Sequence, residues 1–405
     1  MISDEGPQTG TAGGILLHRL LAAHPPEGLR VIARCVPTIG DPLPGVHYAQ
    51  LLTPWAAFER SRFNRLKRSM RALGLVPGVP QATLDRLVGD FSPDLVLCVM
   101  QHASYYDAAW SFARCRNLPL VVIVHDINDG FEPVLPWARA AARRRDGRFY
   151  RFARCRLCVS PEMAGLCESF YGARGDVLYP NRSPDLAPRA YDDSASLRTP
   201  GTLTLGFAGN LGYGYGTEIL RLLPALREAG ARVVIYSRRP AGPYAALAEA
   251  PDVCDWRGFV PSAQAWSAIQ RDCDAVWLPY PNPAGSMEQL FRYHFPSKLP
   301  EYLALGMPVL VTGPSYATGA KWAIGHPAAT VFSPAESLPE FSRLLVRLRE
   351  QGVLRRALAE AAWSAGEADF SPRKLEADFH SRIEMAARTG LVEQAQELPP
   401  SSLPG

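Results

Sequence analysis

The sequence lacks the features of membrane-spanning, secreted and metal-binding chains. No apolar run approaches the roughly 20 residues that a membrane-spanning helix needs. The N-terminal segment Met1–Gly6 contains neither a basic nor an apolar stretch, so it does not resemble a secretory signal. No carboxylate-rich cluster has the spacing of a divalent-metal site, and no nucleic-acid recognition motif is present. We therefore expect a cytoplasmic protein that uses no metal, no cofactor and no nucleic acid.

Cysteine does not form a disulfide framework. The eight cysteines are scattered, and several, such as Cys98 and Cys158, lie inside apolar runs. This usage is typical of small buried residues in a reducing compartment. Cys155 and Cys158 form a CxxC pair, but no second pair accompanies it, so we favour a structural role over zinc binding or redox chemistry.

Two segments hold a concentrated positive charge in a chain whose net charge is only +4. Arg60–Arg71 contains six Lys or Arg residues and no acid, and Arg139–Arg156 contains eight arginines against Asp146 alone. One interpretation is a pair of solvated helix faces. The other is a docking surface for an anionic membrane or an anionic acceptor, which would place the protein peripherally at the inner membrane face.

Length and pattern predict two α/β domains. The chain has 405 residues, of which 47% are hydrophobic and 20% charged, enough for two packed cores. Short β-branched apolar runs alternate with helix-like segments, which is typical of parallel sheets with crossover helices. The expected strands are Leu29–Pro37, His47–Leu52, Leu95–Met100, Leu120–His125, Cys155–Ser160 and Asp176–Tyr179, then Leu203–Ala208, Arg232–Tyr236, Val253–Phe259, Ala275–Leu278, Val309–Val311 and Thr330–Phe332.

These two series predict a Rossmann-like domain at each end of a linker. We expect an N-terminal domain over residues 1–185, a linker over 186–200 and a second domain over 201–370. A final helix over 371–390, with Phe370, Leu375, Phe379 and Ile383 at near-helical spacing, is expected to pack back on the first domain. The tail over 391–405 is expected to be disordered.

The central strand of the first domain is missing from this pattern. Gly13-Gly14 is expected on the turn after that strand, ahead of a helix over Ile15–Ala23, yet no convincing strand precedes it. Either Met1-Ile2-Ser3 is a truncated strand, or the start of the sequence lies downstream of the true one. We favour the second explanation, because a central parallel strand is buried on both faces.

The stretch Phe295–Val311 carries the strongest functional pattern. Ser297 is a natural N-cap residue, Pro300 falls in the first helical turn, and Gly306 can end the helix before the next strand. A helix N-terminus carrying Lys298 favours a diphosphate, and Glu301, one turn in, can accept hydrogen bonds from ribose hydroxyls. A well-capped structural helix is the alternative.

The run Pro-Ser-Lys-Leu-x-Glu-Tyr-Leu-Ala-x-Gly-x-Pro-Val resembles the donor-site motif of retaining GT-B glycosyltransferases of the large family 4 grouping. The resemblance implies two Rossmann-like domains facing across a cleft, with Glu301 on the donor ribose and Ser297 and Lys298 near the pyrophosphate. The family's second glutamate, which contacts the transferred sugar, is replaced here by Tyr293. Neighbouring residues that could substitute for it are Glu288, Arg292 and His294.

Two further segments of the second half resemble the same family. Gly209 and Asn210 follow the strand Leu203–Ala208, and glycines there let the backbone approach a ligand closely. The family's Arg/Lys pair is absent from the segment Gly212–Gly216, so Arg238 and Arg239 are the candidates for phosphate charge. The segment formed by Gly258, Phe259 and Val260 resembles the stretch that receives the nucleobase.

In the first half, His125 stands at the end of the apolar strand Leu120–His125. Ligands of open α/β sheets bind beyond the carboxyl ends of strands, and the family prefers a histidine here. The resemblance implies that His125 hydrogen-bonds the transferred sugar. Gly13 and Gly14 are expected to bring a helix N-terminus to the donor phosphates or the acceptor hydroxyl, and Asp4 and Glu5 to contact the acceptor.

Together these features predict a glycosyltransferase that uses a nucleotide-sugar donor and a glycan or lipid-linked acceptor, in polysaccharide or glycolipid biosynthesis. We expect retention at the anomeric carbon and metal independence, with His125 and Lys298 as the catalytic residues. Two alternatives stay open. One is a nucleotide-sugar epimerase on the same fold, and the other is a degenerate module that binds a nucleotide sugar or scaffolds partners without catalysis.

Overall fold

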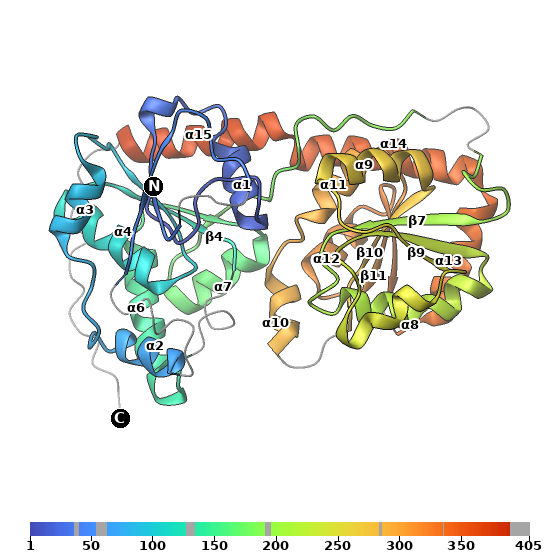
Figure 1. The fold of residues 1–405 in the computed structure, drawn as a ribbon, viewed down its shortest axis with the longest axis horizontal. Helices are drawn as coiled ribbons and strands as arrows, with labels where there is room; N and C mark the ends of the chain where they lie inside the picture. The colour runs from blue at the N-terminus through green and yellow to red at the C-terminus, as the bar shows by residue number, and fades with distance from the viewer. Residues whose placement is uncertain are drawn as a thin grey trace. The chain divides into compact units, whose positions relative to one another are not determined.

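The computed structural model describes residues 1–35, 40–53, 63–126, 134–190, 196–282, 286–334 and 336–388. The chain forms two compact units (Figure 1). Unit 1 comprises Met1–Leu178 and the chain from Glu376 onward, and unit 2 comprises Tyr179–Leu375. None of the described helices is long and apolar enough to cross a membrane.

Unit 1 contains the six strands predicted for the first half, all in parallel pairing. Their bounds are β1 (Arg30–Ala33), β2 (His47–Gln50), β3 (Val96–Val99), β4 (Leu120–Val124), β5 (Cys155–Cys158) and β6 (Asp176–Val177). β1 pairs with β2, and the other four lie in the order β3-β4-β5-β6. β3 and β4 are buried along their whole length, as expected for parallel strands covered on both faces.

The strand that the sequence analysis found missing is present as a three-residue segment, Met1–Ser3. Ile2 forms a parallel bridge with Ile32 of β1, and its amide donates a 2.9 Å hydrogen bond to the carbonyl of Leu97 in β3. Met1–Ser3 therefore lies between β1 and β3 and joins the two sheets. The segment occupies the central position that the sequence pattern left empty, and the two neighbouring strands supply enough hydrogen bonds to hold so short a segment.

The helices of unit 1 cover this sheet, and the first begins earlier than predicted. Gly13 and Gly14 lie inside the first turn of α1 instead of ahead of it. The helices are α1 (Ala12–Leu21), η1 (Pro26–Gly28), α2 (Asn64–Ala72), α3 (Gln81–Val88), α4 (Ala103–Cys115), η3 (Pro136–Ala138), α6 (Arg139–Phe152) and α7 (Pro161–Tyr171).

Unit 2 is a doubly wound domain around one six-stranded parallel sheet, as predicted. Its strands are β7 (Leu203–Ala208), β8 (Ala231–Tyr236), β9 (Cys254–Trp256), β10 (Ala275–Pro279), β11 (Val309–Gly313) and β12 (Thr330–Pro334). They lie in the order β12-β11-β10-β7-β8-β9. The strand order therefore reverses between β7 and β10, and in such sheets ligands bind beyond the carboxyl ends of the strands at this point.

Helices flank both faces of this sheet (Figure 1), with α8 and α13 in contact on one face and α11 and α14 in contact on the other. The helices of unit 2 are α8 (Tyr215–Glu228), η4 (Gly242–Glu249), α9 (Ser262–Asp272), α10 (Ser286–Tyr293), α11 (Lys298–Ala304), α12 (Thr318–Gly325), α13 (Leu338–Glu350) and α14 (Gly352–Phe370). α15 (Pro372–Arg388) crosses from unit 2 into unit 1.

The boundary between the units lies earlier than the predicted linker. The chain enters unit 2 at Tyr179, because the segment that follows is bonded to unit 2. The amide of Arg189 donates to the carbonyl of Leu305 at 2.9 Å, and Arg182 forms an ion pair with Glu367. Residues 191–195 of the predicted linker and the predicted tail over 391–405 lie outside the described residues.

The predicted final helix corresponds to α15, and its predicted apolar side chains are buried. Leu375, Phe379 and Ile383 have little exposed surface. Arg382 of the same helix forms a 2.7 Å ion pair with Asp176 of β6. Both of these residues belong to unit 1, as does the whole of α15 from Glu376 onward.

Candidate functional site

The sequence motifs of unit 2 meet around the carboxyl end of β7. The chain leaves β7 at Ala208 and continues through Gly209 toward α8, while α11 carries Lys298 to the same place. This position borders β10, where the strand order of the sheet reverses. The structure therefore brings together Gly209 and Lys298, which the sequence analysis assigned to the donor site from separate motifs.

Lys298 is a partly buried cation with no carboxylate partner in the described part of the chain. Its Nζ lies 4.4 Å from the centroid of the Tyr215 ring and 5.7 Å from that of Phe207. Aromatic faces attract a cation, but they do not neutralise its charge. Burial lowers the pKa of the Lys298 ammonium to about 8. An anion placed beside this nitrogen would gain an interaction that the protein itself does not supply.

Gly209 is the residue that lets Lys298 lie so close to β7. Its φ of +129° is open to glycine and strained for other residues. A Cβ atom at this position would lie 2.6 Å from Cε of Lys298, well inside van der Waals contact. Gly209 therefore allows both the turn after β7 and the close approach of Lys298.

The loop from Asn210 to Gly214 is held in a fixed conformation at the start of α8. The side chain of Asn210 accepts a 2.8 Å hydrogen bond from the amide of Gly212. Tyr213 has a φ of +57° and Gly214 a φ of +85°, and a Cβ on Gly214 would lie 2.7 Å from Pro281, just beyond β10. Asn210 thus shapes the loop, and its exposed position leaves it open to solvent.

α11 is shorter than the motif predicted, and its N-terminus lacks the predicted side-chain cap. Ser297 stands at the N-cap position, but its side chain makes no capping hydrogen bond, because the residue itself has helical φ and ψ. Pro300 falls in the first turn and Gly306 has a φ of +59°, both as predicted. With only seven residues, α11 offers a weak dipole, so the charge of Lys298 is its main contribution to an anion site.

Glu301 lies one turn after Lys298 on α11 and is only 7% exposed. Its carboxylate accepts a long hydrogen bond, 3.4 Å, from the amide of Ser183. The three-residue spacing puts Glu301 and Lys298 on the same side of the helix. The predicted ribose ligand is thus near the predicted phosphate ligand, and it also contacts the segment that enters unit 2.

Beyond β8 and β9, an exposed aromatic ring lies next to an exposed arginine. Phe259 is 71% exposed, and the guanidinium carbon of Arg238 lies 5.8 Å from its ring centroid. Gly258 has a φ of +80° and open space around it. Phe259 and Arg238 were predicted from separate motifs as base and phosphate contacts, and the structure places them side by side.

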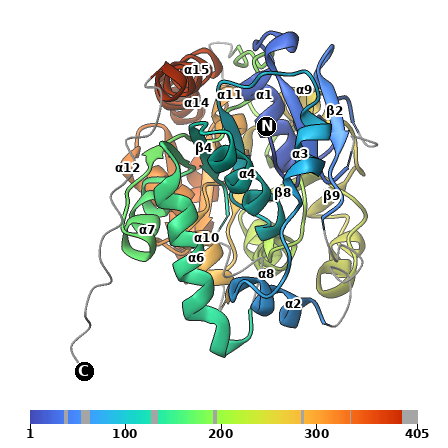
Figure 2. The same ribbon diagram turned by 90° about the vertical axis from the view of Figure 1, so that its left-hand side faces the viewer.

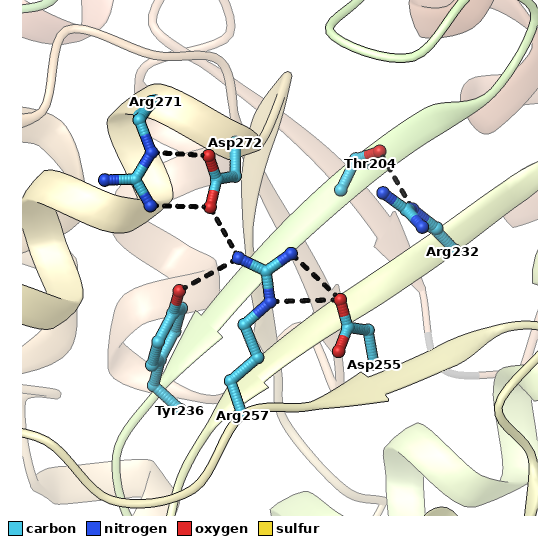
Figure 3. A network of polar contacts seen from close by, with 7 residues as sticks. All are labelled: Thr204, Arg232, Tyr236, Asp255, Arg257, Arg271 and Asp272. Atoms are coloured by element: carbon cyan, nitrogen blue, oxygen red, sulfur yellow. Dashed lines mark hydrogen bonds and ion pairs between the residues drawn. The ribbon is translucent and has the colours of Figure 1, made fainter.

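Arg257, between β9 and this loop, is held by an ion-pair network (Figure 3). Its guanidinium donates to the carboxylates of Asp255 and Asp272 and to the hydroxyl of Tyr236, the last at 3.3 Å. These bonds anchor the backbone from which Gly258, Phe259 and Val260 extend. Arg257 is therefore a structural residue, whereas Arg238 and Arg239, the two predicted phosphate candidates, are both exposed.

Tyr293 stands where the resembled family has its second glutamate. It lies with its neighbour His294 at the end of α10, and both are half-buried. The carbonyl of His294 accepts a hydrogen bond from the hydroxyl of Thr318, so the backbone is fixed there. Glu288 and Arg292 form an ion pair with each other along the helix. A sugar contact by either of these two would have to compete with that pair.

In unit 1, His125 directly follows β4 and is half-buried at the carboxyl end of the sheet, where the sequence analysis expected it. The next residue, Asp126, accepts a 3.5 Å hydrogen bond from Gln101, which follows β3. The sequence analysis missed a second histidine at this edge. His102 Nε2 lies 3.3 Å from Oδ2 of Asp4, a buried carboxylate after the first strand. The sequence could have indicated this pair, because Asp4 and His102 each follow a strand of the same sheet.

The start of α1 already has an anion beside it. The hydroxyl of Thr11 donates to Glu5, and a Cβ on Gly13 would lie 2.5 Å from Oε2 of the same carboxylate. Burial, followed by the charge of Asp4, raises the pKa of the Glu5 carboxyl. Gly13 therefore makes room for a carboxylate of the chain itself, and Gly14 packs closely against Gln8 and Thr11. The role of these glycines toward a donor phosphate stays a prediction.

The chain is similar to known proteins in part of its sequence and in its fold. Residues 15–181 match the family described as "Glycosyl transferase 4-like domain". A search of curated protein sequences gave no match. Among solved structures, the chain resembles HepE of Anabaena in complex with UDP and glucose, at 14% identity and a TM-score of 0.62, over 94% of this chain and 98% of that one.

Two other structures are similar over almost the whole chain. Sucrose-phosphate synthase from Thermosynechococcus elongatus matches at 12% identity and a TM-score of 0.67, over 96% of this chain and 97% of that one. WaaG, a glycosyltransferase involved in lipopolysaccharide biosynthesis, matches at 14% identity and a TM-score of 0.57, over 94% and 98%. At such identities the likeness establishes the fold, and it confirms the predicted GT-B architecture.

Proposed function

We propose that the chain is a glycosyltransferase that transfers a sugar from a nucleoside-diphosphate donor, bound in unit 2, to an acceptor hydroxyl; the family match over residues 15–181 and the GT-B fold support this. The observation that carries the proposal is Lys298. A partly buried ammonium with no carboxylate partner among the described residues, at the reversal point of a doubly wound sheet, is suited to a diphosphate. The UDP bound to HepE makes UDP-sugars the first donors to test.

Each part of the donor has a candidate residue in unit 2. Lys298 binds the diphosphate, and Glu301, one turn further along α11, accepts hydrogen bonds from the ribose hydroxyls. Phe259 offers an exposed ring for the base, with Arg238 beside it. Tyr293 and His294 at the end of α10 are the candidates for contacts with the transferred sugar.

The proposed reaction needs positioning and charge stabilisation more than proton transfer by the protein. The bond between the anomeric carbon and the diphosphate oxygen breaks, and the acceptor oxygen bonds to that carbon on the same face, with retention. The acceptor proton passes to the leaving diphosphate oxygen. Lys298 stabilises the charge that grows on this leaving group, which supports a reaction without a divalent metal.

The acceptor is proposed to be a glycan or a lipid-linked hydroxyl compound of polysaccharide or glycolipid synthesis. Incubation of the purified protein with a UDP-, GDP-, ADP- or dTDP-sugar and candidate acceptors tests the proposal, and NMR of the new anomeric centre tests retention. A chain that converts the donor to an isomeric sugar without any acceptor would be an epimerase. A chain that binds the donor but never turns it over would be a binding or scaffold protein.

Donor affinity is expected to fall as the pH rises through about 8. Burial lowers the pKa of the Lys298 ammonium to about 8, whereas the donor diphosphate stays ionised over this range. A bound diphosphate favours the protonated amine, so affinity is highest below the pKa and is lost above it. The dissociation constant should rise about tenfold between pH 7 and pH 9. Isothermal titration calorimetry measures it.

The matched control for this pH dependence is Glu301→Gln. This variant removes a charged hydrogen bond to the ribose, and we expect it to weaken binding by about 1.5–3 kcal/mol at every pH in the range. Both proteins keep Lys298, so the tenfold change with pH should persist in the variant, in addition to a loss of affinity that does not vary with pH. A wild-type dissociation constant that is the same at pH 7 and pH 9 would contradict the placement of Lys298 on the diphosphate.

His125→Ala is expected to lower turnover more than donor affinity. His125 lies at the carboxyl end of the unit 1 sheet, and we propose that it hydrogen-bonds the transferred sugar near the reacting carbon. Loss of one hydrogen bond that strengthens in the transition state should reduce kcat by roughly 10- to 100-fold, with a change in donor dissociation constant below about threefold. Equal losses in both quantities would exclude that role.

A further inference from the structure

The two basic segments of the sequence come together in unit 1. α2, from the first segment, contacts α6, from the second, and Figure 2 shows the two helices next to each other. The amide of Leu135, just before η3, donates a 2.8 Å hydrogen bond to the hydroxyl of Ser69 in α2. Residues 54–62, which include Arg60 and Arg62, lie outside the described residues.

This arrangement corrects the interpretation of the segments as solvated helix faces. Lys67 and Arg71 are each only 5% exposed, and Arg145 of α6 is mostly buried as well. Asp107 of α4 forms ion pairs with both Arg71 and Arg145. Part of the predicted surface charge is therefore inside the unit, where charge must be balanced by a partner.

Beside these buried arginines lies an open groove of about 560 Å³, formed by α2, the chain after it, α4 and α6. Four arginines line it, Arg71, Arg144, Arg145 and Arg148, and Asp107 is the one acidic residue of its lining. Arg144 and Arg148 are exposed and form no ion pair with the described residues. Arg145 also pairs with Asp146, at 3.7 Å, outside the lining. Two carboxylates against four guanidinium groups leave a net positive site.

Two buried donors of the groove lining also lack an acceptor among the described residues. Arg71 uses Nη1 for Asp107, at 3.4 Å, and its Nη2 has no hydrogen-bond partner. Nε1 of Trp110, in α4, has none either. A buried N–H without an acceptor costs roughly 1–3 kcal/mol, so such groups are normally satisfied by a bound molecule or water.

The chain exposes large apolar side chains along α2 and in the segment after it, which forms part of the groove. Leu73, which lines it, is about half exposed, and Leu75, in the following turn, is 62% exposed. Leu66 and Phe63, at the start of α2, also have substantially exposed side chains. Large apolar side chains around a basic site are typical of surfaces that meet the headgroups and the upper acyl region of a membrane.

We propose that this groove binds the phosphate of an anionic lipid headgroup. Arg71, Arg144 and Arg148 supply N–H donors to the phosphate oxygens, and planar guanidinium groups suit this ligand. The exposed Leu73, in the lining, and Leu75, two residues further on, contact the lipid around the bound headgroup. The site is a defined pocket for one headgroup, distinct from a diffuse attraction between a basic surface and an acidic membrane. It does not depend on the donor site of unit 2.

The test compares two variants that lose the same charge. Arg144→Ala/Arg148→Ala removes two exposed arginines of the groove, and Arg65→Ala/Arg139→Ala removes two exposed arginines of the same two helices outside its lining. All four side chains are exposed, so both variants should keep the melting temperature of the wild type. Binding is measured by cosedimentation with vesicles of phosphatidylcholine, alone or with phosphatidylglycerol, in about 0.1 M salt.

We expect the wild type to bind only the vesicles with phosphatidylglycerol, the groove variant to bind them at least tenfold more weakly, and the control variant to remain within about threefold. Similar losses in both variants would show a diffuse basic surface and overturn the proposal, as would a wild type that binds neither vesicle. Titration with glycerol 3-phosphate separates the two sources of phosphate. Tight binding of this soluble ester without vesicle binding would contradict a lipid ligand.

Discussion

Lys298→Met should abolish donor binding and, at the same time, make the donor-free protein more stable than the donor-free wild type. The variant removes the one cation that the account places on the diphosphate, so we expect a loss of at least about 100-fold in kcat/KM, or roughly 3 kcal/mol. Methionine keeps the length and apolar contacts of the lysine chain beside Gly209, Phe207 and Tyr215.

The gain in stability follows from the burial of a charge. The pKa of Lys298 is about 8 in the folded chain, below its ordinary value of about 10.4, so folding disfavours the charged form. The cost, about 1–3 kcal/mol, is fully present below pH 8 and disappears as the pH rises from 8 to 10.4. Lys298→Met should therefore unfold at a higher temperature than the wild type at pH 7, and at nearly the same temperature near pH 10.

Lys321→Met, at an exposed position of α12, is the matched control, and it should change neither quantity substantially. Calorimetric melting curves at pH 7 and pH 10 measure the stability, and initial rates measure the activity. A Lys298→Met protein that is less stable than the wild type would show that the ammonium has a structural partner. One that keeps its activity would remove Lys298 from the diphosphate.

Gly209→Ala should damage the same site by a different route. The new Cβ would lie 2.6 Å from Cε of Lys298, and alanine is strained at a φ of +129°. We expect the free energy of unfolding to fall by about 1–3 kcal/mol and the donor dissociation constant to rise at least tenfold, because Lys298 must move away from β7. Thermal melting and calorimetric titration give the two numbers.

Gly201→Ala is the control for this variant. Gly201 also has a positive φ, +73°, but nothing lies within 4 Å of the position of its Cβ. Alanine there introduces backbone strain without a clash, at a position outside the candidate donor site. If Gly201→Ala weakens donor binding as much as Gly209→Ala does, backbone strain alone explains the loss and the contact with Lys298 is irrelevant.

The strands were predictable because parallel strands covered on both faces are written as continuous apolar runs. β4 and β10, for example, are apolar from end to end and fully buried. The segment Met1–Ser3 gave no such signal, since three residues are too few for a pattern. Its place between β1 and β3 follows from hydrogen bonds to residues 30 and more than 90 positions away, which local sequence does not encode.

The candidate site was predictable in its residues and only partly in its contacts. Lys298 and Gly209 were recognised from separate motifs, but their approach depends on the packing of α11 against the end of β7. The same limit applies to the basic segments. Charge spacing alone does not show that Arg71 is buried against Asp107 while Arg144 is exposed, because both facts arise from the contact between α2, α4 and α6.

Caps and helix starts were the least reliable predictions. Ser297 has the right side chain for a cap, yet its helical backbone prevents it from capping α11. Gly13 and Gly14 lie inside α1, which begins earlier than predicted, and Glu5 lies beside Gly13. In both cases the residue type was recognised from the sequence, and the local backbone conformation was not.

The central claim is that unit 2 binds a nucleotide sugar through Lys298, and thermal stabilisation by UDP-, GDP-, ADP- and dTDP-sugars tests it most directly. A ligand at 100 times its dissociation constant should add about 2.7 kcal/mol of stability. The account predicts that donors of one nucleobase raise the melting temperature of the wild type and leave Lys298→Met unchanged. Stabilisation by none of the four, or equal stabilisation of both proteins, would contradict it.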